Sequence, residues 1–126
     1  YSFTSSHACN SFGLFMFISL LIKNRTLSLS LLLWAAINCF SRIYLGVHYP
    51  GDILCGAIVG TLLGLFTYFV YAFVHKKLDC HPPRITSNYT SSGFLVEDAN
   101  LMTSSIYLTF VFITIYALIY INNNIL

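Results

Sequence analysis

Four apolar segments, separated by shorter polar stretches, dominate the hydrophobic pattern of this chain. Two of them, residues 53–74 and 101–121, run for 22 and 21 residues without a charge. A helix needs roughly 20 residues to cross the hydrocarbon core of a bilayer, so both are long enough to span it. The two earlier segments, 8–22 and 26–40, contain 15 residues each. Their length alone does not decide between a membrane span and a buried helix.

The polar stretches predict how these helices connect. A three-residue polar turn, 23–25, separates the first two segments, which is typical of an antiparallel helical hairpin. Residues 78–100 form a sustained polar region rich in Pro, Ser and Asn, which predicts a loop. The chain is therefore predicted to be an all-α, integral-membrane helical bundle of about four transmembrane helices. Its parts are a three-helix core in 1–77, the loop in 78–100 and a further transmembrane helix in 101–121.

The composition supports a surface that faces lipid. Hydrophobic residues make up 57% of the 126-residue chain and charged residues only 8%, whereas soluble domains carry about 25% charged residues. The net charge of +2 is small, and its basic residues are scattered rather than striped, which argues against a nucleic-acid partner. Membrane lipids are the surroundings that this composition predicts.

Basic residues predict the orientation in the membrane. Two basic clusters, 23–25 and 75–77, fall on the same side after three alternating crossings, and the positive-inside rule assigns that side to the cytoplasm. The loop 78–100 is then cytoplasmic. Residues 4–7 and 41–52 are expected to meet on the opposite face.

The segment 41–52 carries candidate chemistry at this opposite face. Ionisable residues at the edge of an apolar bundle are costly and are therefore functional candidates. Arg42 offers a planar set of donors suited to phosphate oxygens. A turn at Pro50-Gly51 could bring the Asp52 carboxylate back to His48, fix its tautomer and leave the other ring nitrogen free to attack. The simpler interpretation of Asp52 is an N-cap of the following helix, and the two uses are compatible.

The opening residues form a second candidate site. Ser5, Ser6 and His7 precede an apolar helix, and the hydroxyls and free N–H groups at a helix start bind anions. His7 could donate a proton to a leaving oxygen. A lone interfacial histidine is more often non-catalytic, so the argument depends on the two segments acting together.

Two further patterns have mainly structural interpretations. Gly56, Gly60 and Gly64 form a small-residue stripe that lets helices approach closely; packing within one chain is favoured, and a homo-oligomer is the alternative. Cys80-His81 could be half of a metal site, but the sequence offers no partner pair with zinc-type spacing. No metal is therefore expected.

With these residues in view, the chain resembles the type 2 phosphatidic acid phosphatase superfamily. The third motif of that family is Ser-Arg, five residues, His, three residues, Asp, and Ser41-Arg42, His48 and Asp52 match it at every fixed position. The second motif is Pro-Ser-Gly-His. The chain has residues 4–7 (Thr-Ser-Ser-His) in its place, so that proline and glycine are both replaced.

The resemblance implies a membrane phosphatase that hydrolyses lipid phosphate monoesters or diphosphates through a phosphohistidine intermediate. His48 would be the nucleophile, Asp52 would orient it, and His7 would protonate the leaving group. The implied phosphate-binding residues are Arg42, Ser5 and Ser6. No metal or organic cofactor is implied, and a lipid phosphate is the expected substrate.

Other functions remain open. Vanadium-dependent haloperoxidases share the motif scaffold, but they are soluble, which the apolar segments disfavour. A catalytically inactive relative that binds or packs against lipid is the main alternative, because Thr4 and Ser6 depart from the motif. The family's first motif would lie before Tyr1, so residues 1–126 are expected to be part of a longer protein and inactive alone. A bacterial inner membrane, with the active site facing the periplasm or exterior, is the expected location.

Overall fold

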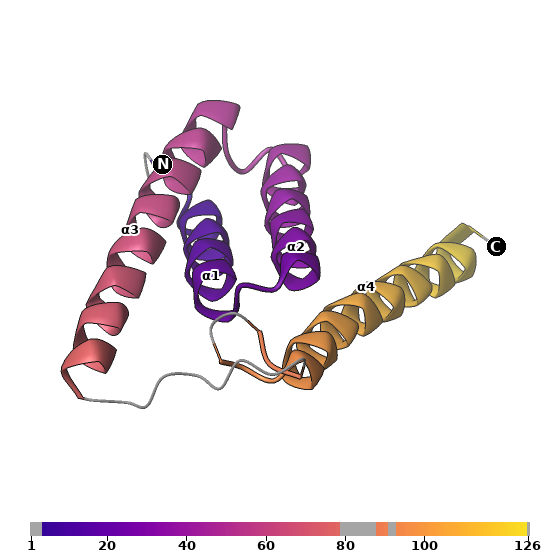
Figure 1. Ribbon diagram of the computed structural model, residues 1–126. Helices are drawn as coiled ribbons and strands as arrows, with labels where there is room; N and C mark the ends of the chain where they lie inside the picture. Colours follow the sequence, from indigo (N-terminus) through magenta and orange to yellow (C-terminus); the bar gives the residue numbers. More distant parts are fainter. Residues whose placement is uncertain (1–3, 79–87, 91–92, 126) are drawn as a thin grey trace.

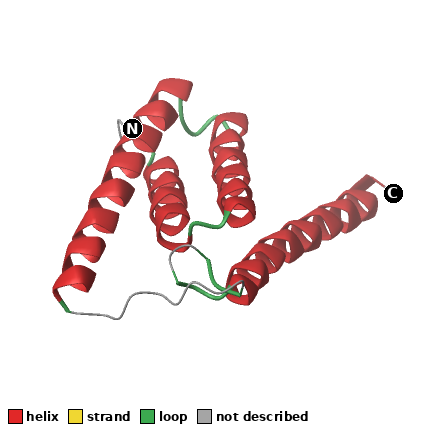
Figure 2. Ribbon diagram, viewed as in Figure 1, coloured by secondary structure: helices red, strands yellow, loops and turns green. Residues whose placement is uncertain are grey.

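Four α-helices make up the described part of the chain, which comprises residues 4–78, 88–90 and 93–125 of a computed structural model. In chain order they are α1 (Ser6–Ile22), α2 (Arg25–Tyr44), α3 (Pro50–Lys77) and α4 (Val96–Ile125) (Figure 1). Figure 2 shows helices joined by loops, and no strand occurs within those ranges. The predicted all-α class is confirmed.

Three helices are long and apolar enough to cross a membrane. They are α2 with 20 residues, α3 with 28 residues, and the 28-residue stretch Val96–Asn123 of α4. The 17-residue α1 is a shorter apolar helix. The segment 26–40, ambiguous by its length, therefore belongs to a helix of spanning length, because α2 continues to Tyr44.

The predicted boundary between loop and last helix is wrong. Residues 96–100 were expected in the loop 78–100, but α4 begins at Val96. Glu97 and Asp98 lie in the first turn of α4, where the partial positive charge of a helix start stabilises acidic side chains. Their charge therefore suits the beginning of a helix.

The polar turn after α1 ends one helix and starts the next. Lys23 has a left-handed backbone conformation with φ 54°, and its N–H donates to the carbonyl oxygen of Ser19. The Asn24 side chain then accepts from the backbone N–H of Leu27 at 3.1 Å and so caps α2. The expected helical hairpin is present, with α1 and α2 running in opposite directions (Figure 1).

The glycine stripe on α3 packs against α1 of the same chain. A Cβ added at Gly56 would lie 2.6 Å from the carbonyl oxygen of Ser5, and one at Gly60 would collide with the backbone of Cys9. At Gly64 the carbonyl oxygen of Gly13 would be 2.6 Å away. The favoured interpretation, packing within one chain, is what the structure has. The alternative, an oligomer through these glycines, stays a prediction.

Helix α4 touches the α1–α2 hairpin near its beginning and then diverges from it. A small apolar cluster joins Ala99 to Ile22, Leu27 and Leu31 of the hairpin. Further along α4, the hydroxyl of Tyr107 lies 3.0 Å from that of Ser30. Residues 111–123 are all exposed, and Figure 1 shows this part of α4 pointing away from α1–α3.

The outer surface of the helices suits lipid better than water. Large apolar side chains such as Leu62, Phe66, Phe69 and Phe112 are 60–71% exposed. Hydroxyls on the same surfaces are satisfied within their own helix: that of Thr67 donates to the carbonyl oxygen of Leu63 at 2.8 Å. Such internal pairing is required of polar groups in a hydrocarbon core, which offers no water.

Candidate functional site

Three helix ends bring the two candidate segments together. Figure 1 places the start of α1, the end of α2 and the start of α3 at one end of the bundle. There the backbone N–H of Ser5 donates to the carbonyl oxygen of Asp52 at 3.2 Å. The α1–α2 turn and the end of α3, which carry the basic clusters, lie at the other end. The expected meeting of residues 4–7 with 41–52 is therefore observed.

A short loop carries His48 between α2 and α3. The backbone turns at Gly46, whose φ of 66° is left-handed and favours glycine. The N–H groups of Gly46 and Val47 donate back to the last turn of α2, to Ile43 and Arg42. These bonds hold the loop against the helix end that carries Arg42.

The predicted turn at Pro50-Gly51 is wrong, because both residues are already in the first turn of α3. Proline suits this position, since its missing N–H would have no partner there. The predicted N-cap role of Asp52 is also wrong. The N-cap of α3 is Tyr49, and Asp52 lies about one turn further along, at position N3. The helix itself, rather than a turn, returns Asp52 toward His48.

His48 and Asp52 form a partly exposed pair. The His48 Nδ1 lies 3.8 Å from the Asp52 Oδ2, and the side chains are 17% and 25% exposed. This separation permits an ion pair and is longer than a hydrogen bond. The same Oδ2 accepts from the backbone N–H of Tyr49 at 3.2 Å. Asp52 therefore secures the start of α3 from the N3 position rather than as the predicted N-cap. Its carboxylate lies beside the imidazole, and its role in orienting His48 stays a prediction.

Arg42 occupies the last turn of α2 and is partly buried. Its Nε is buried, and among the described residues no acceptor lies within hydrogen-bonding distance of it. Buried donors without partners are rare because each one costs free energy. A buried guanidinium nitrogen without an acceptor is suited to an anion that is absent from the protein itself.

The start of α1 presents two of its three predicted site residues to the outside. Ser6 and His7 are exposed in the first turn, whose N–H groups lack intrahelical acceptors. Ser5 is fully buried, and its Oγ accepts from the backbone N–H of Ala8 at 3.4 Å. The hydroxyl of Ser5 therefore caps the helix, and a direct role in binding phosphate stays a prediction.

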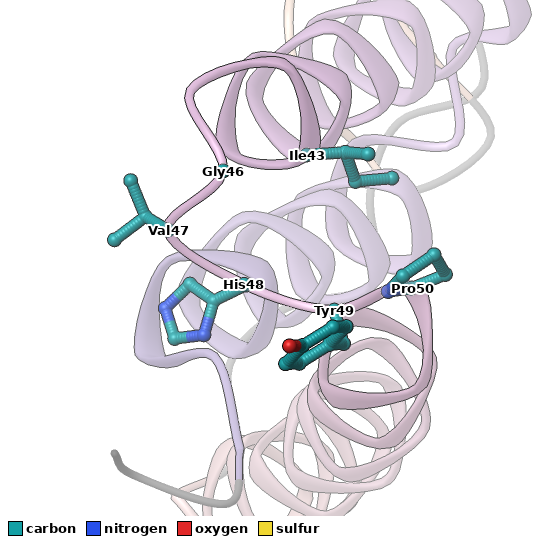
Figure 3. Close-up of a pocket in the computed structure, with 6 residues that line it drawn as sticks. All are labelled: Ile43, Gly46, Val47, His48, Tyr49 and Pro50. Carbon is teal, nitrogen blue, oxygen red and sulfur yellow. The ribbon is translucent and has the colours of Figure 1, made fainter.

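A cavity of about 600 Å³ opens beside the nucleophile candidate. In Figure 3 the rings of His48 and Tyr49 lie on the same side of the loop, and Ile43 lies on the other. Of the predicted site residues, His48 alone lines this cavity within the described ranges. Sequence reasoning missed its apolar wall, although the apolar residues around His48 were a signal. The lining consists of Ile43, Gly46, Val47, His48, Tyr49 and Pro50.

The candidate half-site for a metal ion follows α3 in the sequence. Cys80 and His81, the half-site considered from the sequence, lie outside the described residues. In the ranges 4–78, 88–90 and 93–125, no three His, Cys, Asp or Glu side chains gather closely enough to hold a metal ion.

Comparisons with known proteins agree on one family. The family model of the PAP2 superfamily matches residues 1–77. The chain is 43% identical over 83 residues to a lipid A 4'-phosphatase of Bacteroides thetaiotaomicron, which covers 66% of this chain and 37% of that protein. It is 35% identical over 77 residues to a lipid A 4'-phosphatase of Porphyromonas gingivalis, covering 61% and 33%.

A third relative has a different named substrate. The chain is 34% identical over 71 residues to an undecaprenyl-diphosphatase of Bacillus subtilis, covering 56% of this chain and 35% of that protein. The chain thus spans about a third of the length of these curated relatives. No solved structure matches it. Because the family model covers more than half of the chain, and both motif segments lie inside the matched residues, this protein belongs to the PAP2 superfamily.

Proposed function

We propose that the complete protein is a membrane phosphatase that hydrolyses phosphate monoesters or diphosphates on lipids. The observation that carries the proposal is the convergence of both motif segments at one end of the bundle, through the bond from Ser5 to Asp52. The groups that support it at that end are the histidine–carboxylate pair, the start of α1 and a buried arginine nitrogen that has no acceptor among the described residues. In the proposal these groups serve as the nucleophile, the anion-binding helix end and the cation for phosphate oxygens.

In the proposed first step, His48 attacks phosphorus. The Asp52 carboxylate faces Nδ1 and would hold the proton there, so that the lone pair of Nε2 forms the N–P bond. The P–O bond to the leaving group breaks, and protonated His7 would give its proton to the departing oxygen. In the second step a water oxygen attacks phosphorus, His7 takes a proton back, and the N–P bond breaks to release phosphate.

Phosphate binding would depend on Arg42 and the start of α1. The Nε of Arg42 needs an acceptor, and Ser6 and His7 occupy the first turn of α1, with N–H groups suited to an anion. Fixed donors of this kind stabilise the charge of a phosphoryl transition state without reorganising. Serine in place of the motif's glycine at position 6 adds a hydroxyl at the same helix end.

The lining of the cavity supports the proposal of a lipid substrate rather than a small polar one. Its wall beside His48 includes Ile43, Val47 and Pro50, whose apolar surface suits the hydrocarbon next to a phosphate. Two relatives are named for the hydrolysis of phosphate or diphosphate on lipids: a lipid A 4'-phosphatase and an undecaprenyl-diphosphatase. A phosphate or diphosphate carried by a membrane lipid is therefore the proposed substrate class.

The site is proposed to face away from the cytoplasm. Lys76 and Lys77 end α3 at the end of the bundle opposite His48 (Figure 1), and basic residues favour the cytoplasmic side. In a bacterial inner membrane the site would then face the periplasm.

The decisive experiment uses the full-length protein purified in detergent. Phosphate release should be observed from at least one of three substrates: lipid A, undecaprenyl diphosphate and phosphatidic acid. His48→Ala should abolish both release and an acid-labile, alkali-stable phosphoenzyme. No release from any of the three by the wild type would favour the inactive relative, and release that survives His48→Ala would remove the proposed nucleophile.

A further inference from the structure

A hydrogen bond between α1 and α2 lies one helical turn inside the candidate site. The side-chain Nδ2 of Asn38 on α2 donates to the Oγ of Ser11 on α1 at 3.3 Å. Ser11 is 4% exposed, and Asn38 is half-buried. Two polar side chains therefore meet inside an otherwise apolar part of the bundle. Neither of them belongs to the motif residues discussed above.

The register connects this bond to the site. Ser11 follows His7 by four residues, and Asn38 precedes Arg42 by four residues. Residues four apart share one face of a helix and stack along its axis. Because α1 and α2 are antiparallel (Figure 1), one turn from the bond toward the open end reaches His7 on one helix and Arg42 on the other. The bond thus lies one helical turn from each of these two residues.

The surrounding contacts between these helices are less directional. Ala8, Cys39 and Ile53 form an apolar cluster near the site, with Phe12 packed against it. Apolar packing depends on buried area rather than on orientation, so it tolerates a rotation of one helix against the other. A hydrogen bond weakens steeply when its angle changes. An amide that lost its partner in these surroundings would also be costly, which keeps the bond formed.

We infer that Asn38 and Ser11 are positioning residues that set the spacing and relative rotation of His7 and Arg42. This inference rests on the proposed function, in which His7 protonates the leaving group and Arg42 holds the phosphate. A phosphate bound by Arg42 presents its leaving oxygen to His7 only if α1 and α2 keep their register. Misplacement of a reacting group by about 1 Å can cost on the order of a hundredfold in rate.

The first test measures kinetics in the full-length protein. Asn38→Leu keeps the size of the side chain and removes its donor, and Ser11→Ala removes the acceptor. Each should lower kcat by roughly ten- to a hundredfold on a lipid phosphate, with a smaller effect on KM. The double variant should be no worse than either single one. The loss should shrink on p-nitrophenyl phosphate, whose leaving group needs little protonation.

A matched control comes from a similar bond away from the site. Ser30, also buried on α2, pairs with Tyr107 of α4 at 3.0 Å. Ser30→Ala should leave kcat and its dependence on the leaving group unchanged. Ser11→Thr keeps the hydroxyl, so its kcat should stay close to that of the wild type. Additive losses of equal size on both substrates, or losses in Ser30→Ala as large as in Ser11→Ala, would overturn the positioning role.

The second test does not require activity. The full-length protein, with its native cysteines replaced by alanine, carries spin labels at positions 7 and 42. Double electron–electron resonance then reports the distance between the two helices. Asn38→Leu should shift or broaden that distance distribution, and Ser30→Ala should not. An unchanged distribution in Asn38→Leu would overturn the inference. If the wild type released no phosphate, the proposed function would fail while this distance measurement still decided whether the bond sets the spacing.

Discussion

The backbone N–H of Ser5 donates to the carbonyl oxygen of Asp52 at 3.2 Å, so the cap of α1 is bonded to the first turn of α3. Each residue belongs to a different motif segment. The bond uses backbone atoms of both residues, which leaves the Asp52 carboxylate for the N–H of Tyr49 and for His48. The two segments are therefore held together without consuming the side chains that the proposed chemistry needs.

The substitution Asp52→Asn should separate the two tasks of this side chain. The amide would keep an oxygen that can accept from the N–H of Tyr49 but would lose the charge that faces His48. We expect kcat of the full-length protein to fall by several orders of magnitude, on the order of 10⁴ as for a tautomer-fixing carboxylate in another enzyme class. The melting temperature should change little. A large loss of stability with nearly intact kcat would show that Asp52 acts only as a cap.

The role of His7 predicts a dependence on the leaving group. His7→Ala should lower the rate of phosphoenzyme formation by roughly 100-fold or more on an alkyl phosphate. The loss should be much smaller on p-nitrophenyl phosphate, because an acidic phenol leaves without help from a proton donor. Single-turnover measurement of phosphoenzyme formation with both substrates checks this. Equal losses would remove His7 from the acid role.

Substitution at Gly60 should weaken the bundle. A Cβ there would collide with the backbone of Cys9, which cannot swing aside as a side chain can. We expect Gly60→Ala to cost about 1–3 kcal/mol through overpacking, despite the better helix propensity of alanine. Thermal unfolding in detergent, followed by circular dichroism, measures it. Gly51→Ala is the control, since no atom of the described residues lies within 4 Å of that added Cβ, and it should be neutral or slightly stabilising.

The two ends of the bundle should lie on opposite sides of the membrane. In a variant without native cysteines, a cysteine at Asn24 or Lys77 should react with an impermeant reagent only from the cytoplasmic side. A cysteine at Val47, exposed in the loop that carries His48, should react only from outside. Labelling of whole cells against inverted vesicles separates the sides. Labelling of Asn24 and Val47 from one side would contradict the proposed orientation.

Much of the fold follows from local pattern. Apolar segments predicted the four helices, and the polar turn at 23–25 predicted the hairpin, because both effects depend on neighbours in sequence. The start of α4 was misplaced, since acidic residues such as Glu97 occur both in loops and in first helical turns. The four-residue spacing of His48 and Asp52 predicted their proximity, but it was attributed to a turn when the helix provides it.

The rest of the site depends on how the helices are rotated against each other. Burial of the Arg42 Nε and the pairing of Asn38 with Ser11 are set by which face α2 turns toward α1. An apolar helix that is hydrophobic on nearly all sides gives little pattern from which to read that rotation. The glycines of α3 were the exception, because small residues mark the face where another helix comes close.

The glycine contacts between α1 and α3 also have a mechanical consequence. The close backbone approach at Gly56, Gly60 and Gly64 leaves no room for a side chain between the two helices, so α1 and α3 are expected to move as one rigid body. His7 and Asp52 then move together as parts of that body. The Asn38–Ser11 bond ties α2 to α1, so the freedom to admit a bulky lipid falls to the loop at Gly46, which carries one wall of the cavity. Entry of substrate is thus coupled to movement of the loop that carries His48.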